Sequence, residues 1–169
     1  MRIVFFVHAI ASCWNNGNAH FLRGVVSALQ YLGHEVIVYE PREAWSRENL
    51  VADHGDAALA GFAAEFPTVR PRLYGPDQDL AELTDAADLV IVHEWNDPHL
   101  VNALGRLRAR SGDFLLLFHD THHRAATRPE EMRRFDLSGY DGVLAFGGAI
   151  ADLYRNQGWS GRCWARPFR

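Results

Sequence analysis

Residues 1–40, MRIVFFVHAIASCWNNGNAHFLRGVVSALQYLGHEVIVYE, contain the pattern that decides the fold. The run Ile3–Val7 is continuously apolar, as in a parallel strand that is covered on both faces. A helical stripe follows, with apolar residues spaced three or four apart: Phe21, Leu22, Val25, Val26 and Leu29. Gly33 is placed to end this helix, and Val36–Tyr39 follows as a second strand. This order predicts a parallel βαβ unit.

The same alternation continues to the end of the chain. Further apolar runs occupy Leu89–Val92, Phe114–Phe118 and Val143–Phe146. Helical patterns separate them, and one of these helices can begin at Asp97 with Pro98 in its first turn. We therefore predict an α/β domain with a doubly wound, mainly parallel, Rossmann-like sheet and helices on both faces. The expected strand order is 3-2-1-4-5-6, with residues 67–76 as a short edge strand.

Composition narrows the range of functions. The chain has 169 residues, 48% of them apolar, so it has the size of one domain and is not disordered or collagen-like. Its 17 basic residues are all arginines, which are scattered in a chain of net charge −4. No basic stripe is present, so we expect no nucleic-acid partner. No apolar stretch is long enough to cross a membrane, and the two cysteines have no CxxC spacing. These features predict a soluble, cytoplasmic protein.

Histidines gather where the predicted strands end. Three loops follow the first, fourth and fifth strands: HAIASCWNNGNAHF at 8–21, HEWNDP at 93–98 and HDTHHR at 119–124. Seven of the nine histidines lie in or beside these loops: His8, His20, His93, His99, His119, His122 and His123. Doubly wound sheets bind ligands outside the carboxyl ends of their strands. We therefore expect a polar ligand site at this edge.

The first loop does not have the pattern of a dinucleotide site. Such a site needs GxGxxG, and only Gly17 is present, between Asn16 and Asn18. We therefore expect no nicotinamide cofactor. Gly17 would let a phosphate approach the start of the helix, where free amides favour anions. A turn glycine between asparagines is the alternative.

The second and third loops carry side chains that suit a sugar or a phosphate. His93 can donate a hydrogen bond to a hydroxyl or a phosphate, and Glu94 can orient an acceptor. Trp14 and Trp95 offer flat faces to a sugar ring or a lipid chain, with packing beneath the loops as the alternative. Arg124 would be a bidentate phosphate anchor or, alternatively, a solvated charge at a helix start.

A metal site is a further interpretation of the same loops. Nitrogen and oxygen donors are supplied by His93, His119, Asp120, His122 and His123, as a zinc or two-metal hydrolase would use. However, adjacent side chains diverge unless the loop kinks, and neither HxHxDH nor HExxH occurs. We favour hydrogen-bonding histidines and no metal. A metal-dependent hydrolase and a stand-alone ligand-binding module remain the alternatives.

Four segments resemble GT-B glycosyltransferases in their order and spacing. MRIVFFVH followed by NGNAHFLRGVVSALQYLGHEVIVYEP resembles the opening of these enzymes. DLVIVHEWNDP and FHDTHHR resemble the D-x-x-H-x-H-E-x and T-x-H-D segments of the family 4 type, and DGVLAFGGAIADLY resembles the strand and helix near the end of the domain. The sequence is most similar to the CgeB-like bacterial glycosyltransferases, and the resemblance extends from residue 1 to about residue 160.

This resemblance implies transfer of a sugar from a nucleotide-sugar donor to a sugar or lipid-like acceptor, without a cofactor. Gly17 would lie near the donor diphosphate, His93 would contact the transferred sugar, and Glu94 would lie on the acceptor side. His119 and Asp120 would line the cleft. The chain departs from the pattern where Asn16–Gly17 replaces the typical glycine pair and where Ile91 replaces a histidine.

The resemblance also implies a domain organisation. Residues 1–160 would form the N-terminal, acceptor-side domain, and 161–169 would begin the interdomain connection. The C-terminal, donor-binding domain would lie outside this sequence, because GT-B enzymes are about twice as long. Alone, the acceptor-side domain should be weakly active or inactive, since positional and electrostatic catalysis needs both walls of the cleft.

Overall fold

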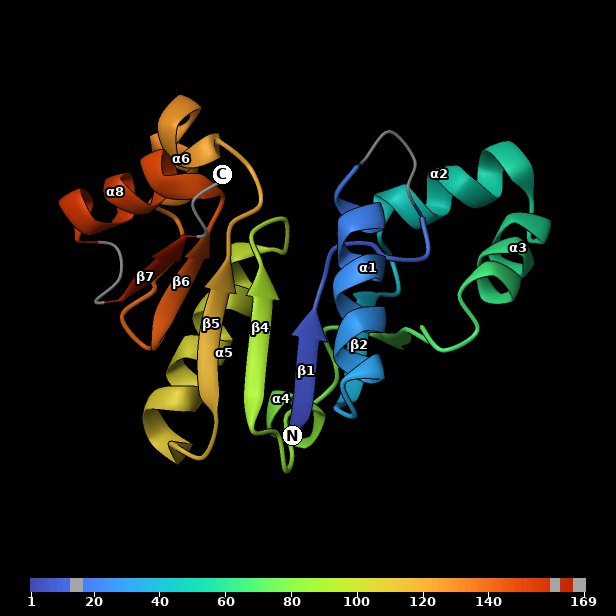
Figure 1. Cartoon of the computed structure of the whole chain (residues 1–169), viewed down its shortest axis with the longest axis horizontal. Helices are drawn as coiled ribbons and strands as arrows, with labels where there is room; N and C mark the ends of the chain where they lie inside the picture. The colour runs from blue at the N-terminus through green and yellow to red at the C-terminus, as the bar shows by residue number, and fades with distance from the viewer. Residues whose placement is uncertain (13–16, 159–161, 166–169) are drawn as a thin grey trace.

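The computed structural model describes residues 1–12, 17–158 and 162–165. Its strands form one parallel sheet in the order β3-β2-β1-β4-β5-β6-β7 (Figure 1). The strand bounds are β1 Arg2–Phe6, β2 Glu35–Pro41, β3 Arg72–Tyr74, β4 Leu89–His93, β5 Leu115–His119, β6 Gly142–Ala145 and β7 Cys163–Ala165. The predicted doubly wound α/β fold and the order 3-2-1-4-5-6 are confirmed, and β7 extends the sheet by one strand.

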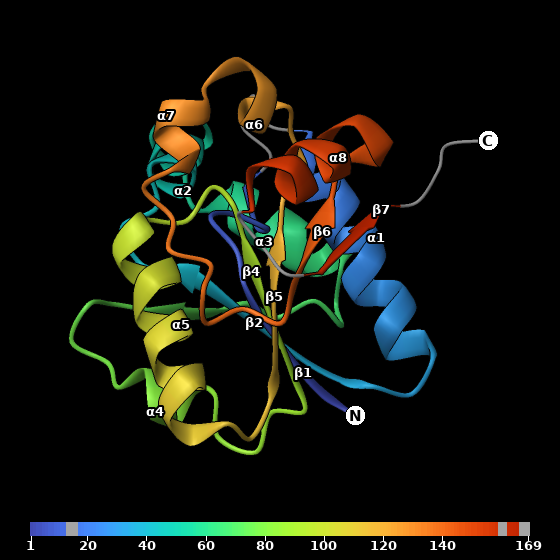
Figure 2. The ribbon, with the colours of Figure 1, turned by 90° about the vertical axis from the view of Figure 1, so that its left-hand side faces the viewer.

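Helices cover both faces of the sheet (Figure 2). Their bounds are α1 Asn18–Tyr31, α2 Trp45–His54, α3 Ala57–Glu65, α4 Leu80–Leu83, α5 Pro98–Ser111, α6 Arg124–Thr127, α7 Pro129–Met132 and α8 Gly147–Gln157. Side chains of α1 and α3 pack on one face with Phe5, whereas those of α5 and α8 pack on the other with Phe6. Because successive strand residues face opposite layers and both layers are apolar, β1 has no polar alternation.

Local signals set the helix ends that position the loops. The Asp97 side chain accepts a hydrogen bond from the backbone N–H of His99 at 2.7 Å, and Pro98 occupies the first turn of α5. Asp97 therefore caps α5 as predicted. Gly33, with φ of +83°, follows α1 and lets the chain turn back into β2.

Two elements differ from the sequence-based expectation. β7 pairs in parallel with β6 and so adds a strand to the expected order. Phe21, expected on the inward stripe of α1, is 52% exposed, because the buried face of this helix is carried by Leu22 and Val26. None of the described helices is long and apolar enough to cross a membrane.

Candidate functional site

The carboxyl ends of β4 and β5 bring two histidines together. His93 and His119 are the last residues of these strands and are direct partners in the parallel register. Their ring centroids lie 5.7 Å apart at 65°. Neighbouring parallel strands end at the same edge of a sheet, so the pairing follows from strand order and register. The ring of Phe21 approaches His119 from α1, with centroids 5.8 Å apart.

A hydrogen-bonded chain links His93 to Glu94 through Thr121. The Thr121 hydroxyl donates to Glu94 Oε1 at 3.3 Å, and its oxygen lies 2.9 Å from His93 Nε2. A hydroxyl has one proton, and when Thr121 gives it to Glu94, His93 Nε2 is the donor to Thr121. His93 Nδ1 is then an acceptor, and it is buried without a hydrogen-bond partner.

Burial shifts the titration of these groups in opposite directions. Burial is the main cause that lowers the pKa of His93 well below 6.5 and that of His119 to about 4. Burial, followed by the charge of Asp120, raises the pKa of Glu94 to about 8, although Arg124 and Thr121 oppose the rise. At neutral pH the site therefore combines uncharged imidazoles with a protonated carboxyl group.

Asp120 is fixed from two sides. Its Oδ2 accepts a hydrogen bond from the Tyr154 hydroxyl of α8 at 2.8 Å, and its Oδ1 accepts from the His122 backbone N–H at 2.9 Å. Burial raises the pKa of this carboxyl, whereas its bonds to His122 and Tyr154 lower it. Asp120 thus ties the β5 end to α8 and holds the start of the 119–124 loop.

Arg124 is engaged within the protein. Its guanidinium donates to the backbone oxygen of Glu94 at 2.5 Å, and it lies 4.2 Å from the centroid of the Trp95 ring. It also lies 3.9 Å from Glu94 Oε2 and 3.6 Å from Glu131 Oε2. These contacts make Arg124 a support for the 93–95 segment, rather than the solvated charge that was the alternative interpretation.

The adjacent histidines of the third loop stack rather than diverge. The rings of His122 and His123 lie with centroids 4.0 Å apart at 27°, and Trp95 meets His122 edge to face at 5.8 Å. Among residues 1–12, 17–158 and 162–165, no three His, Cys, Asp or Glu side chains form a group that could hold a metal ion.

The first loop is described only in part. Trp14 and Asn16 lie outside the described residues. Gly17 precedes α1 and has open space where a side chain would be, and Asn18 is the first residue of the helix. Gly17 is the N-cap residue of α1 and has no side chain with which to cap it. The helix begins at the same edge of the sheet as His93 (Figure 1).

Sequence reasoning did not select several residues of this edge. Thr121 and Tyr154 position His93, Glu94 and Asp120, but a single threonine or tyrosine has no distinguishing pattern. Glu40, which directly follows the second predicted strand, is fully buried and accepts from the backbone N–H groups of Ile10 and Ala11 at 3.4 and 3.3 Å. Burial raises the pKa of its carboxyl.

The buried polar atoms without hydrogen-bond partners are concentrated at this edge. Within the described residues, all except Gln30 Oε1 belong to residues at or after the carboxyl ends of β1, β2, β4 and β5: His8, Glu40, His93, Glu94, Trp95, Asn96, His119, His122 and Arg124. Buried polar groups are normally paired, so a cluster of unpaired ones requires an explanation, and a ligand is one.

Comparisons with known proteins add no assignment. No protein-family model and no curated protein sequence matches the chain.

Proposed function

We propose that the chain is the acceptor-side domain of a glycosyltransferase that uses a nucleotide-sugar donor. The observation that carries the proposal is the cluster of unpaired buried donors and acceptors around His93, Glu94 and His119. A sugar supplies many hydroxyl groups, each both donor and acceptor, and can satisfy such a cluster at short range. The cluster lies where doubly wound sheets bind ligands. The resemblance to GT-B enzymes in the same loops supports the choice of substrate.

The site residues would hold the acceptor and the transferred sugar. His93 Nδ1 would accept a hydrogen bond from a hydroxyl group, since its other ring nitrogen is bonded to Thr121. Glu94, protonated near neutral pH, would donate one. The free amides at the start of α1, next to Gly17, would face the donor diphosphate. The acceptor oxygen would bond to the anomeric carbon, the bond to the diphosphate oxygen would break, and the departing diphosphate would take the hydroxyl proton.

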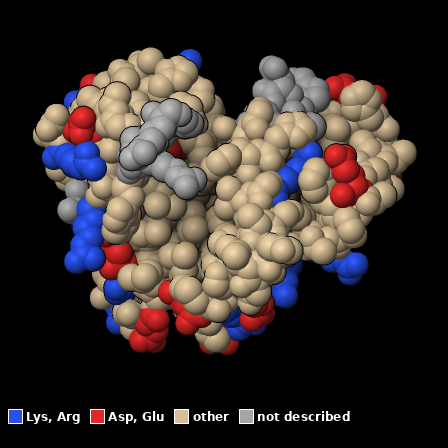
Figure 3. Space-filling view, in the orientation of Figure 1, with Lys and Arg blue, Asp and Glu red and all other residues tan. Residues whose placement is uncertain are grey.

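The charge distribution is compatible with a neutral acceptor. On the face seen in Figure 3, arginines and acidic side chains are interspersed and lie mostly around the rim. A neutral, hydroxyl-rich ligand needs no extended charged surface, because directed hydrogen bonds determine its orientation.

The test is an assay of sugar transfer with the full-length natural gene product. The purified product is given a panel of nucleotide sugars with sugar and lipid-linked acceptors, and release of the nucleoside diphosphate is measured. We expect acceptor-dependent release that His93→Gln reduces by about a hundredfold or more, as for the loss of a group that contacts the reacting sugar. His34→Gln, at the half-buried position directly before β2, is the matched control.

Circular dichroism and thermal unfolding check that each variant is folded. A folded His93→Gln protein with the wild-type transfer rate would remove His93 from the site. The hydrolase alternative would replace the proposal if the protein neither transferred nor bound a sugar and instead showed a hydrolytic activity that is lost when metal ions are chelated.

A further inference from the structure

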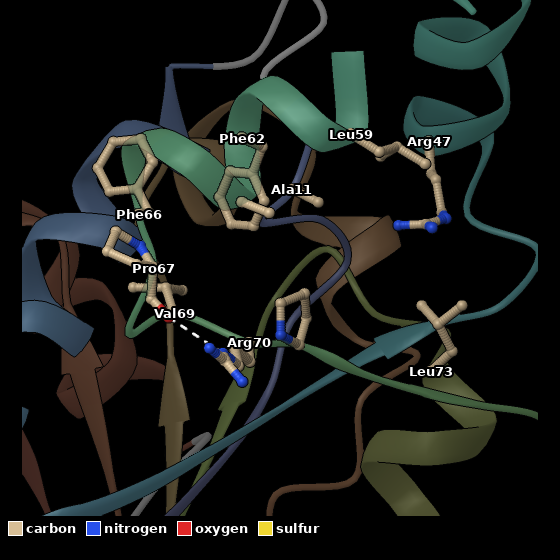
Figure 4. Close-up of a pocket in the computed structure, with 11 residues that line it drawn as sticks. Ala11, Arg47, Leu59, Phe62, Phe66, Pro67, Val69, Arg70 and Leu73 are labelled. Carbon is tan, nitrogen blue, oxygen red and sulfur yellow. Dashed lines mark hydrogen bonds between the residues drawn. The ribbon is translucent and has the colours of Figure 1, made fainter. Parts of the chain in front are cut away.

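A pocket of about 380 Å³ opens among α2, α3 and the chain that leads into β3 (Figure 4). Its walls are mainly apolar and include Leu59, Phe62 and Phe66 with Pro67 and Val69. The volume lies within the range of natural small-molecule sites. None of these wall residues belongs to the histidine cluster at β4 and β5, so the pocket is a separate feature of the molecule.

Two arginines supply positive charge to this pocket. In Figure 4 the Arg47 side chain extends from α2 towards the pocket, and Arg70 lies on the opposite side. Arg70 uses its Nε to donate to the backbone oxygen of Pro67 at 3.1 Å, which leaves its terminal nitrogens available. Neither arginine lies within ion-pair distance of a carboxylate of the described residues, although the charge of Arg47 is near enough to Glu40 to lower the pKa of that carboxyl. Guanidinium groups in this state are well suited to a carboxylate or phosphate.

The aromatic wall is held in place from the protein side. The guanidinium of the buried Arg23 lies 4.9 Å from the Phe62 ring centroid and 5.0 Å from that of Phe66. Arg23 also donates to the backbone oxygens of Ile10 and Ala11 at 2.8 and 3.0 Å. A wall fixed in this way costs little entropy to order when a ligand binds. Its rings are available to an apolar chain or ring.

We propose that this pocket binds a monomeric anionic amphiphile. Its apolar part lies against Phe62 and Phe66, and its carboxylate or phosphate lies between Arg47 and Arg70. The apolar walls alone would accept any apolar molecule, but the two unpaired guanidinium groups select an anion. The site is independent of the proposed glycosyltransferase activity, because it uses different residues and involves no covalent step.

The experiment is calorimetric titration of the full chain with decyl phosphate and decanoate below their micellar concentrations, and with decanol below its solubility limit. Variants Arg47→Gln and Arg70→Gln remove one charge each, and Arg110→Gln makes the same change on the exposed end of α5. Ala63→Trp fills the pocket from the exposed side of α3 without crowding the core. Phosphatidylglycerol vesicles present the same anionic chemistry as a membrane surface.

We expect both anions to bind and decanol to bind at least tenfold more weakly. Loss of one charge-assisted contact should weaken decyl phosphate binding about tenfold in Arg47→Gln and in Arg70→Gln. Ala63→Trp should abolish binding, and Arg110→Gln should leave it unchanged.

Three results would overturn the proposal. The first is no binding of either anion at 1 mM, roughly the weak end of specific affinities. The second is unchanged affinity in a folded Ala63→Trp protein, which would place the ligand elsewhere. The third is binding to the vesicles without binding of the monomers. Transfer activity is not a readout, so failure here leaves the glycosyltransferase proposal untouched.

Discussion

Glu94→Gln should change how stability depends on pH. The Glu94 side chain is fully buried, and its pKa is raised from 4.5 to about 8. In the unfolded chain the carboxyl ionises near its ordinary pKa, whereas the folded protein keeps it protonated until about pH 8. The folded state therefore binds more protons between these values, and the free energy of unfolding falls as the pH rises. The penalty is absent below about pH 4.5 and constant above about pH 8.

The magnitude follows from this pKa difference. Each pH unit within the window costs about 1.4 kcal/mol, so between pH 6.5 and pH 8 the wild-type protein should lose about 2 kcal/mol through Glu94. The lowered pKa values of His93 and His119 change stability mainly below about pH 6.5, and both proteins carry these histidines, so their contribution cancels in the comparison. Glu94→Gln is isosteric and keeps an oxygen for the Thr121 hydroxyl, so it should remove most of the slope.

Urea denaturation at a series of pH values measures the effect. The comparison includes Glu43→Gln, a matched change at an exposed position. We expect the difference between Glu94→Gln and wild type to grow by about 2 kcal/mol from pH 6.5 to pH 8, and no such growth for Glu43→Gln. A constant difference across this range would show that Glu94 is ionised in the folded protein, and the argument for a protonated carboxyl in the site would fail.

Three further predictions test the core, a helix cap and the second histidine. Phe118→Ala should cost about 3–5 kcal/mol in urea denaturation because the ring is fully buried, whereas Phe21→Ala should cost under about 1 kcal/mol; equal costs would contradict the core assignment. Asp97→Ala should cost about 1 kcal/mol through the lost cap of α5, against little change for the exposed Asp113→Ala. The His119 ring should titrate near pH 4 in an NMR titration, and stability should fall from about pH 6.5 to pH 4 because the unfolded chain takes up that proton first; a midpoint near 6.5 would refute the burial.

Most of the fold could be predicted because its strands are buried on both faces. A continuous run such as Val4–Phe6 has no polar alternation only when both neighbouring layers are apolar, and this indicates a parallel sheet. β7 and α2 escaped prediction for physical reasons. β7 has only three residues, too few to show a recognisable pattern of apolar residues, and it is stabilised by pairing with β6. α2 buries only Ser46 along its length, so it has no apolar stripe to recognise.

The candidate site was predictable to the level of the loops but not of the contacts. Strand order places the residues after β4 and β5 side by side, and this brings His93 and His119 together. The tautomer of His93 depends on its hydrogen bond to Thr121. Thr121 lies 28 positions further along the sequence, and the turn after β5 orients its side chain. The Tyr154 bond to Asp120 depends on how α8 packs against that turn. Side-chain direction in such turns is set by packing, which no periodicity in one sequence reveals.

The unpaired polar atoms mark the point along β4 where residues that stabilise the sheet give way to residues of the proposed ligand site. Along β4, Val90 and Val92 are fully buried and apolar, as a strand covered on both faces requires. At the next position, His93 is just as enclosed but keeps one ring nitrogen without a partner. A leucine or valine there would remove that desolvation cost. Folding alone therefore gives no reason for a histidine at the end of β4. The same holds for Glu94, so the cost that these residues impose on stability agrees with the ligand site proposed above.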